Sequence, residues 1–82
     1  MFKKTNEQIS VLVAFMKNKV MPLSFEWGGR NYSIDKVNLA YSSRTGRKLW
    51  HYFSVSSGNS CFKLALDSES NNWVLQEAAY NQ

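Results

Sequence analysis

Large apolar side chains alternate with polar ones on both sides of two short turn sequences, Gly28-Gly29 and Gly58-Asn59. Alternation with a period of two is typical of a half-buried strand, because successive side chains of a strand point to opposite faces. Glycine and asparagine tolerate the positive φ that two-residue hairpin turns require. The pattern therefore predicts a mainly β fold, a small antiparallel meander of five or six strands curled into a barrel or a strongly bent sheet.

The first turn fixes which residues of its hairpin lie opposite each other. Directly opposed residues share one face of a sheet. A turn at Gly28-Gly29 gives an apolar face and a polar face, with the pairs Trp27 and Arg30, Phe25 and Tyr32, Leu23 and Ile34, Glu26 and Asn31, and Ser24 and Ser33. After this turn, large residues occupy even-numbered positions up to Ile34 and odd-numbered positions from Val37 to Tyr41. This change predicts one extra residue near Asp35-Lys36, a β-bulge or a corner that lets the sheet curl.

The second turn gives a register of the same kind. With Gly58-Asn59 at its centre, the inner face holds the pairs Val55 and Phe62, Phe53 and Leu64, and His51 and Leu66. The outer face holds the pairs Ser56 and Cys61, Ser54 and Lys63, Tyr52 and Ala65, and Trp50 and Asp67. Two large aromatic side chains, Trp50 and Tyr52, are thus predicted on the face that the core does not use.

The remaining elements are less sharply defined. Residues 9–15 alternate and contain Ile and Val, which favours a strand. A helix also fits, because Thr5 and Gln8 have the spacing of a capping box and several apolar residues would share one helical face. We expect a connection over residues 17–20, no central ladder position for Pro22, and a closing strand over residues 73–76.

A chain of 82 residues allows one domain, with the folded pattern over about residues 9–76. At this size nearly every large apolar residue must enter the core. The predicted core consists of Leu23, Phe25, Trp27, Tyr32, Ile34, Phe53, Val55, Phe62, Leu64, Leu66 and Trp73.

The first hairpin and the closing tryptophan carry a resemblance. The run from Pro22 to Ile34, followed by Trp50, Tyr52-Phe53-Ser54-Val55, Phe62-Lys63-Leu64 and Trp73-Val74-Leu75, resembles a group of short uncharacterised bacterial β domains. Those domains share a Phe-x-Trp-x-Gly-Arg-x-Tyr hairpin and a closing Trp. The resemblance implies the fold, and it transfers no functional residue because no activity is assigned to that group.

The formal charge of +4 is unevenly placed along the chain. Residues 1–53 carry nine Lys and Arg against three acidic residues, a net +6, whereas residues 54–82 carry one against three, a net −2. A basic balance favours an anionic partner, but it is also typical of an ordinary solvated surface. The single cysteine, Cys61, fits a reducing compartment, and no apolar stretch approaches the roughly 18 to 20 residues of a membrane span. We expect a cytoplasmic protein that contacts no membrane.

Residues suited to catalysis are few. His51 and Cys61 could form a nucleophilic pair, but the predicted register places them on opposite faces and on the order of 17 Å apart. One His and one Cys cannot supply the three or four ligands of a zinc site. Gly28-Gly29 lacks the spacing of a phosphate-binding loop. We therefore expect no enzyme, no metal and no cofactor.

The candidate binding surface combines basic and aromatic residues. We expect residues 42–48 to form a flexible basic loop that leads into the two outward-facing aromatics, beside a lysine of the next strand. The predicted site residues are Arg44, Arg47, Lys48, Trp50, Tyr52 and Lys63.

Two functions fit this surface. Exposed aromatics and an open sheet edge favour a protein-interaction module, through a partner strand or a second copy of the chain. The alternative is single-stranded nucleic acid, because a basic segment beside stacking platforms suits phosphates and bases.

Overall fold

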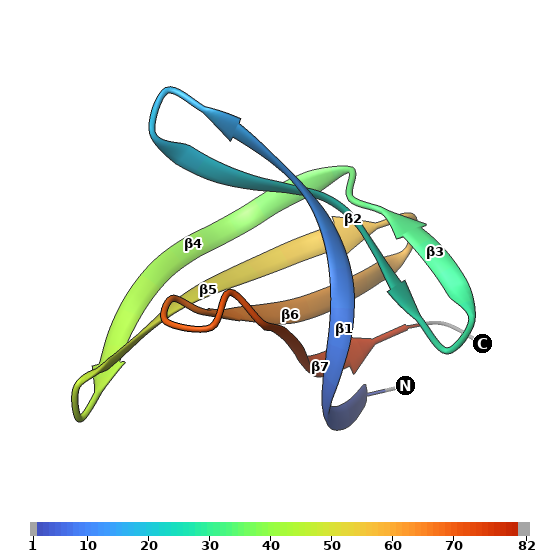
Figure 1. Ribbon diagram of the computed structural model, residues 1–82. Helices are drawn as coiled ribbons and strands as arrows, with labels where there is room; N and C mark the ends of the chain where they lie inside the picture. The colour runs from blue at the N-terminus through green and yellow to red at the C-terminus, as the bar shows by residue number, and fades with distance from the viewer. Residues whose placement is uncertain (1, 81–82) are drawn as a thin grey trace.

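The computed structural model describes residues 2–80, which form one sheet of seven antiparallel strands (Figure 1). Their bounds are β1 (Phe2–Met16), β2 (Lys19–Trp27), β3 (Arg30–Ser33), β4 (Lys36–Thr45), β5 (Lys48–Ser57), β6 (Ser60–Asp67) and β7 (Trp73–Ala79). The predicted fold class is confirmed, but the number of strands was set too low. Residues 1, 81 and 82 of the predicted single domain lie outside the described part of the chain.

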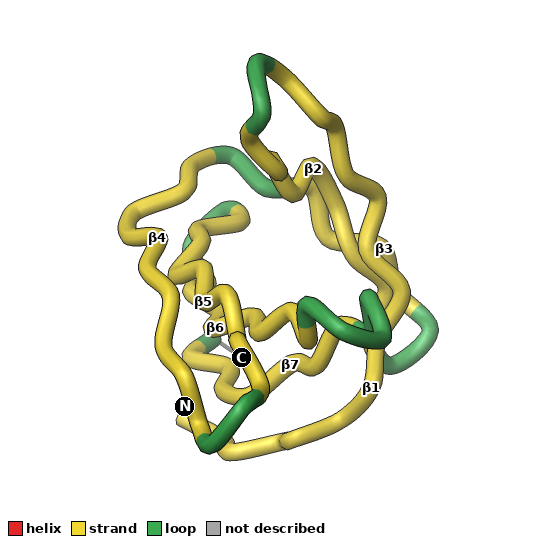
Figure 2. Tube along the Cα trace, turned by 60° about the vertical axis from the view of Figure 1, so that its left-hand side comes forward, coloured by secondary structure: helices red, strands yellow, loops and turns green. Residues whose placement is uncertain are grey.

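The strand order is β3-β2-β1-β7-β6-β5-β4, and the sheet curls into a half-barrel (Figure 2). Consecutive strands are neighbours within β1–β3 and within β4–β7, so each part is a meander. The two meanders join where β1 pairs with β7. Strands β3 and β4 are therefore the two edges of the sheet, although only two residues separate them in the sequence.

Both predicted hairpin registers are confirmed. The β2–β3 pairs include Phe25 with Tyr32, and the β5–β6 pairs include Phe53 with Leu64. Gly28 and Gly29 have φ values of 61° and 77°, which a residue with a Cβ rarely adopts. This geometry is that of a primed turn, whose twist matches the twist of the flanking strands.

The opening segment is a strand, so the helix alternative is wrong. Strand β1 pairs with β7 through its first half and with β2 through its second half. A β-bulge at Thr5-Asn6, where Asn6 has a φ of 49°, bends the strand between Lys4 and Glu7. The connection predicted over residues 17–20 is shorter than expected. Lys17 and Asn18 alone form the turn, both at positive φ, and β2 begins at Lys19.

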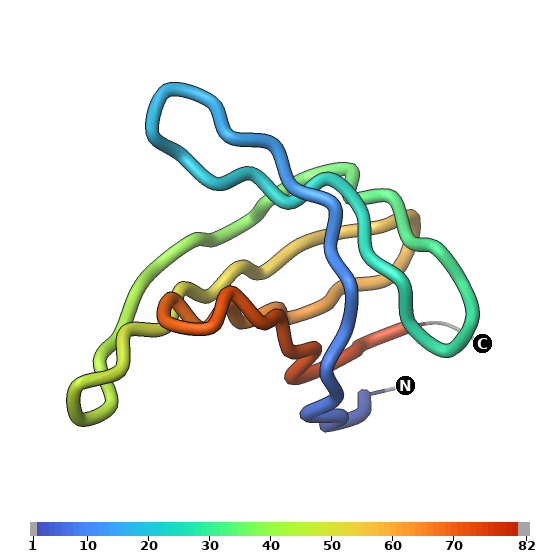
Figure 3. Tube along the Cα trace, in the orientation of Figure 1, coloured from blue at the N-terminus to red at the C-terminus, as the bar shows by residue number. Residues whose placement is uncertain are grey.

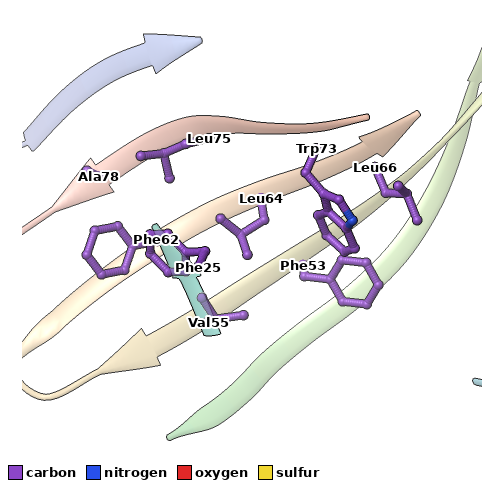
Figure 4. Close-up of a cluster of buried hydrophobic side chains, with 9 residues drawn as sticks. All are labelled: Phe25, Phe53, Val55, Phe62, Leu64, Leu66, Trp73, Leu75 and Ala78. Atoms are coloured by element: carbon purple, nitrogen blue, oxygen red, sulfur yellow. The ribbon is translucent and has the colours of Figure 1, made fainter. Parts of the chain in front are cut away.

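The core fills the concave face of the half-barrel (Figure 4). Seven predicted core residues are buried, and Trp27, Tyr32 and Ile34 pack against them while partly exposed. Leu75 and Ala78 of β7 join the buried cluster, although the sequence analysis left them out of the core. The buried cluster consists of Phe25, Phe53, Val55, Phe62, Leu64, Leu66, Trp73, Leu75 and Ala78.

Leu23 is not a core residue, because 44% of its surface is exposed. The register between β1 and β2 shifts between Leu12 and Val13, which pair with Ser24 and Pro22. Leu23 is therefore the extra residue of a β-bulge, and Pro22 takes the buried position instead.

The parity change predicted near Asp35-Lys36 corresponds to a corner between the two edge strands. The Asp35 N–H donates to the Ser56 carbonyl oxygen at 2.8 Å. The Asp35 carboxylate in turn accepts from the Gly58 N–H at 2.7 Å. These two hydrogen bonds anchor the start of β4 to the β5–β6 hairpin, and beyond this corner β4 diverges from β2 (Figure 3).

Candidate functional site

The outer face of β4, β5 and β6 carries a group of aromatic rings and charged side chains. Because opposed residues share a face, the pairs Tyr41 with Tyr52 and Trp50 with Asp67 lie on the side away from the core. We call this group the outer aromatic cluster. It consists of Tyr41, Lys48, Trp50, Tyr52, Lys63 and Asp67.

Two tyrosines of this cluster form a stacked pair. The ring centroids of Tyr41 and Tyr52 are 5.0 Å apart at an interplanar angle of 23°. The Lys63 Nζ lies 5.9 Å from the Tyr41 centroid and 5.5 Å from the Tyr52 centroid. Hydrogen bonding with the Tyr41 hydroxyl raises the pKa of Lys63 above its ordinary value. The cation is thus held over both rings, where their electron-rich faces attract it.

The third ring, Trp50, is associated with an ion pair. The Lys48 Nζ lies 5.4 Å from the Trp50 ring centroid and 2.9 Å from Asp67 Oδ2. The Asp67 side chain is only 9% exposed, and its Oδ1 accepts from the Glu69 N–H at 3.0 Å. The hydrogen bond from Lys48 is the main reason why the pKa of Asp67 falls to about 2. The charge of Lys48 is therefore already balanced within the molecule.

The predicted flexible basic loop does not exist as a loop. Residues 42–45 belong to β4, Lys48 begins β5, and the turn consists of Gly46 and Arg47. Arg44 pairs with Leu49, which lies on the same face of β5 as the core residue Phe53. Arg44 therefore lies on the concave face and points away from Trp50. Of the six predicted site residues, Lys48, Trp50, Tyr52 and Lys63 come together, whereas Arg44 and Arg47 do not join them.

Sequence reasoning missed Tyr41 as a member of this cluster. The sequence held the information needed to find it. A two-residue turn at Gly46-Arg47 places Tyr41 opposite Tyr52. Asp67 was correctly placed opposite Trp50, but its ion pair with Lys48 depends on where β5 begins.

The β4 edge is the second exposed feature of this region. Every residue of this ten-residue strand except Val37 is exposed, and β4 ends the sheet with no neighbour on its outer side. Leu39 is 56% exposed and Tyr41 is 42% exposed. We use the term "β4 edge" for the backbone and side chains of Lys36–Thr45 on this open side.

A third exposed region is the β1–β2 hairpin, whose turn projects from the half-barrel (Figure 1). Phe15, next to the turn, is 77% exposed. Beneath the hairpin lies a cleft of about 340 Å³, lined by Val11, Val13, Phe15, Val20, Leu66, Asn71 and Trp73. The exposed large apolar residues of this hairpin are Leu12, Phe15, Met16, Met21 and Leu23.

His51 and Cys61 are not close together. His51 pairs with Leu66 and Cys61 with Ser56, so the two side chains lie on opposite faces and five residues apart along β5. The His51 Nδ1 is hydrogen-bonded with the Ser42 hydroxyl at 2.7 Å, across β4 and β5. Among residues 2–80 no three His, Cys, Asp or Glu side chains gather into a group that could hold a metal ion.

No helix within residues 2–80 has the length and apolar character needed to cross a membrane. Comparisons of the chain with protein-family models, with curated proteins and with solved structures find no match. The resemblance to short bacterial β domains therefore stays a prediction, and the function has to be argued from the surfaces themselves.

Proposed function

We propose that this chain is a small non-enzymatic binding module that recognises a protein partner, and that it acts in the cytoplasm. The observation that supports the proposal most strongly is the exposed ten-residue β4 edge. A long open edge offers a row of backbone donors and acceptors that another strand can pair with.

The register indicates which backbone groups are available on this edge. The two-residue turn ties Thr45 to Lys48 as a hydrogen-bonded pair, because a β-turn joins its first carbonyl to its fourth N–H. Antiparallel pairs then alternate between hydrogen-bonded and non-hydrogen-bonded along the unbroken register from Thr45 back to Leu39. The backbone N–H and C=O groups that point away from β5 are therefore those of Ala40, Ser42 and Arg44.

The other edge of the sheet offers less. Strand β3 has only four residues, so a partner strand could form few hydrogen bonds with it. The same counting from the Gly28-Gly29 turn gives outward N–H groups at Asn31 and Ser33. The β3 edge thus serves as an internal control for the β4 edge.

Apolar side chains beside the edge also favour a protein partner. Leu39 and Tyr41 lie on the outer face of the sheet, and each exposes more than a third of its surface. Aromatic side chains are enriched in protein interfaces, and apolar area beside free backbone groups allows both to be buried together.

A second candidate ligand is single-stranded nucleic acid, which the grouping of Lys48, Lys63, Trp50 and Tyr52 favours. Base stacking on these rings requires displacing Lys48 or Lys63 from the ring faces. Arg44 lies on the opposite face. We therefore rank nucleic acid below a protein partner.

The experiment that tests the proposal is affinity selection from a displayed library of random linear peptides. Three proteins serve as bait: the parent chain, Ala40→Pro and Asn31→Pro. Each substitution removes one outward N–H, on the β4 edge and on the β3 edge respectively, and leaves the charge unchanged. Proline is tolerated on edge strands, so both variants are expected to fold, which a urea denaturation curve checks.

We expect peptides that bind the parent and Asn31→Pro but not Ala40→Pro. Peptides that bind all three proteins equally would show that the β4 edge is not the recognition site. A library that yields no binder, together with a salt-sensitive gel shift of short single-stranded oligonucleotides, would favour nucleic acid instead. Sedimentation equilibrium of the parent chain tests whether the partner is a second copy.

A further inference from the structure

The net charge of the chain resides in one hairpin. Residues 36–57, which form β4, its turn and β5, hold four of the ten Lys and Arg and none of the six Asp and Glu. The other residues hold six of each sign and sum to zero. The formal charge of +4 is therefore a property of the β4–β5 hairpin rather than of the whole surface.

Most of this charge is not neutralised by neighbouring strands. Lys48 forms an ion pair with Asp67. Within residues 2–80 no ion pair joins Lys36, Arg44 or Arg47 to a carboxylate. These three side chains are fully available to a ligand, since each is exposed.

The free cations bracket the β4 edge. Lys36 is its first residue, Arg44 is its second-last residue, and Arg47 lies in the turn that follows. The stretch between Lys36 and Arg44 carries no charge and includes the exposed Leu39 and Tyr41. The edge thus presents free backbone groups and apolar area in its middle and positive charge at both ends.

We propose that the β4 edge accepts an extended, acidic segment of a partner protein as an eighth strand, paired through the outward backbone groups of Ala40, Ser42 and Arg44. This inference rests on the proposed function and adds the chemistry of the partner. Carboxylates near the ends of the added strand complement Lys36, Arg44 and Arg47, and apolar side chains between them cover Leu39 and Tyr41.

The same charges argue against a second copy of the chain in this position. An antiparallel pair of β4 strands related by a twofold axis near Ala40 brings the free cations Lys36, Arg44 and Arg47 of one copy beside those of the other. Like charges repel each other, and both hairpins carry a charge of the same sign, so this pairing of two copies is destabilised.

The test uses synthetic ten-residue peptides with a fluorescent label. One peptide repeats Glu-Val, a second repeats Lys-Val, and a third repeats Glu-Pro, which keeps the charge but cannot pair as a strand. Fluorescence anisotropy measures their affinities for four proteins: the parent chain, Ala40→Pro, Asn31→Pro and the double variant Arg44→Glu with Arg47→Glu.

We expect the Glu-Val peptide to bind the parent and Asn31→Pro about equally. Its affinity should fall by about tenfold or more for Ala40→Pro and for the double charge reversal, whereas the Lys-Val and Glu-Pro peptides bind weakly to the parent. In amide hydrogen exchange followed by NMR, the Glu-Val peptide should protect Ala40, Ser42 and Arg44 but not Asn31 or Ser33.

Several results overturn this inference without touching the proposed function. Equal binding of Glu-Val and Lys-Val peptides would show that acidity is not recognised. Equal binding of Glu-Val and Glu-Pro peptides would show a charge contact without strand addition. Failure of the Glu-Val peptide to bind, while library peptides still depend on the β4 edge, would mean that the partner has another composition. An oligonucleotide that displaces the Glu-Val peptide and binds more tightly would assign the basic hairpin to nucleic acid.

Discussion

Strands β4 and β5 have similar lengths and both carry apolar residues at alternate positions, yet one forms the core and the other forms the exposed edge. Phe53 and Val55 of β5 are buried, whereas Leu39 and Tyr41 of β4 are largely exposed. Strand β5 has a neighbour on each side, and Phe53 and Val55 face the concave side of the sheet. Strand β4 has a neighbour on one side only, and the register shift between Val37 and Leu39 turns Leu39 and Tyr41 to the outer face. The register of a strand and its position in the sheet, rather than its own alternation alone, decide which of its side chains are buried.

The largest expected effect is on the core strand. Phe53→Ala should lower the free energy of unfolding by about 3 to 5 kcal/mol, because it removes a large buried side chain and leaves a cavity. The matched change on the edge strand, Leu39→Ala, should cost less than about 0.5 kcal/mol. Urea denaturation of both variants measures the difference. Equal losses would show that β4 is as well packed as β5 in solution.

Trp50 lies between these extremes, since it is half-buried on the outer face under Lys48. Trp50→Ala should lower the free energy of unfolding by about 1 to 2 kcal/mol, through lost ring contacts and a lost cation–π interaction. Trp50→Phe is the control that keeps an aromatic ring, and thermal melts followed by circular dichroism give the comparison. A loss as large as that of Phe53→Ala would make Trp50 a structural residue of the fold.

The smallest expected effect concerns the ion pair that links β5 to the end of β6. Because Lys48 lowers the pKa of Asp67 from 3.8 to about 2, the ionised carboxylate is favoured in the folded state. Its contribution to stability is present above pH 4 and is lost as the pH falls from about 4 toward 2. Asp67→Asn should therefore be less stable than the parent at pH 7, and the difference should shrink over that interval.

Urea denaturation at a series of pH values between 7 and 2 measures this effect. Glu69→Gln is the control, since Glu69 is exposed and close by in the sequence. A constant difference between Asp67→Asn and the parent across the series would show that the charge of Asp67 does not stabilise the fold.

The sequence predicted what local pattern and turn chemistry determine. The glycines of two turns fixed the pairing of Phe25 with Tyr32 and of Phe53 with Leu64, and both pairs are observed. The burial of Phe53 and Leu64 followed from the same alternation. Leu23 was misplaced because the bulge between β1 and β2 is set by how two strands fit together, which neither strand shows alone.

The candidate surface was harder to predict. Residues 42–45 are small, polar or basic and suggest a loop, but pairing with the first residues of β5 makes them a strand. The side on which Arg44 lies depends on the length of the turn at Gly46-Arg47, and a two-residue turn sends it to the concave face. The placement of Lys48, Trp50, Tyr52 and Lys63 on one face followed from the β5–β6 register, which the sequence predicted correctly.

The pairing of β1 with β7 has a consequence for the order in which the chain folds. Phe2 lies opposite Ala79, so this contact joins residues from nearly the whole length of the sequence, whereas each hairpin turn joins neighbours. Closing so long a loop costs entropy before any contact compensates for it, so the two meanders should form first and dock through β1 and β7 last. Pulse-labelled hydrogen exchange during refolding should find the β5–β6 amides protected before those of the β1–β7 ladder. The pairing of β1 with β7 is then the step that limits the folding rate.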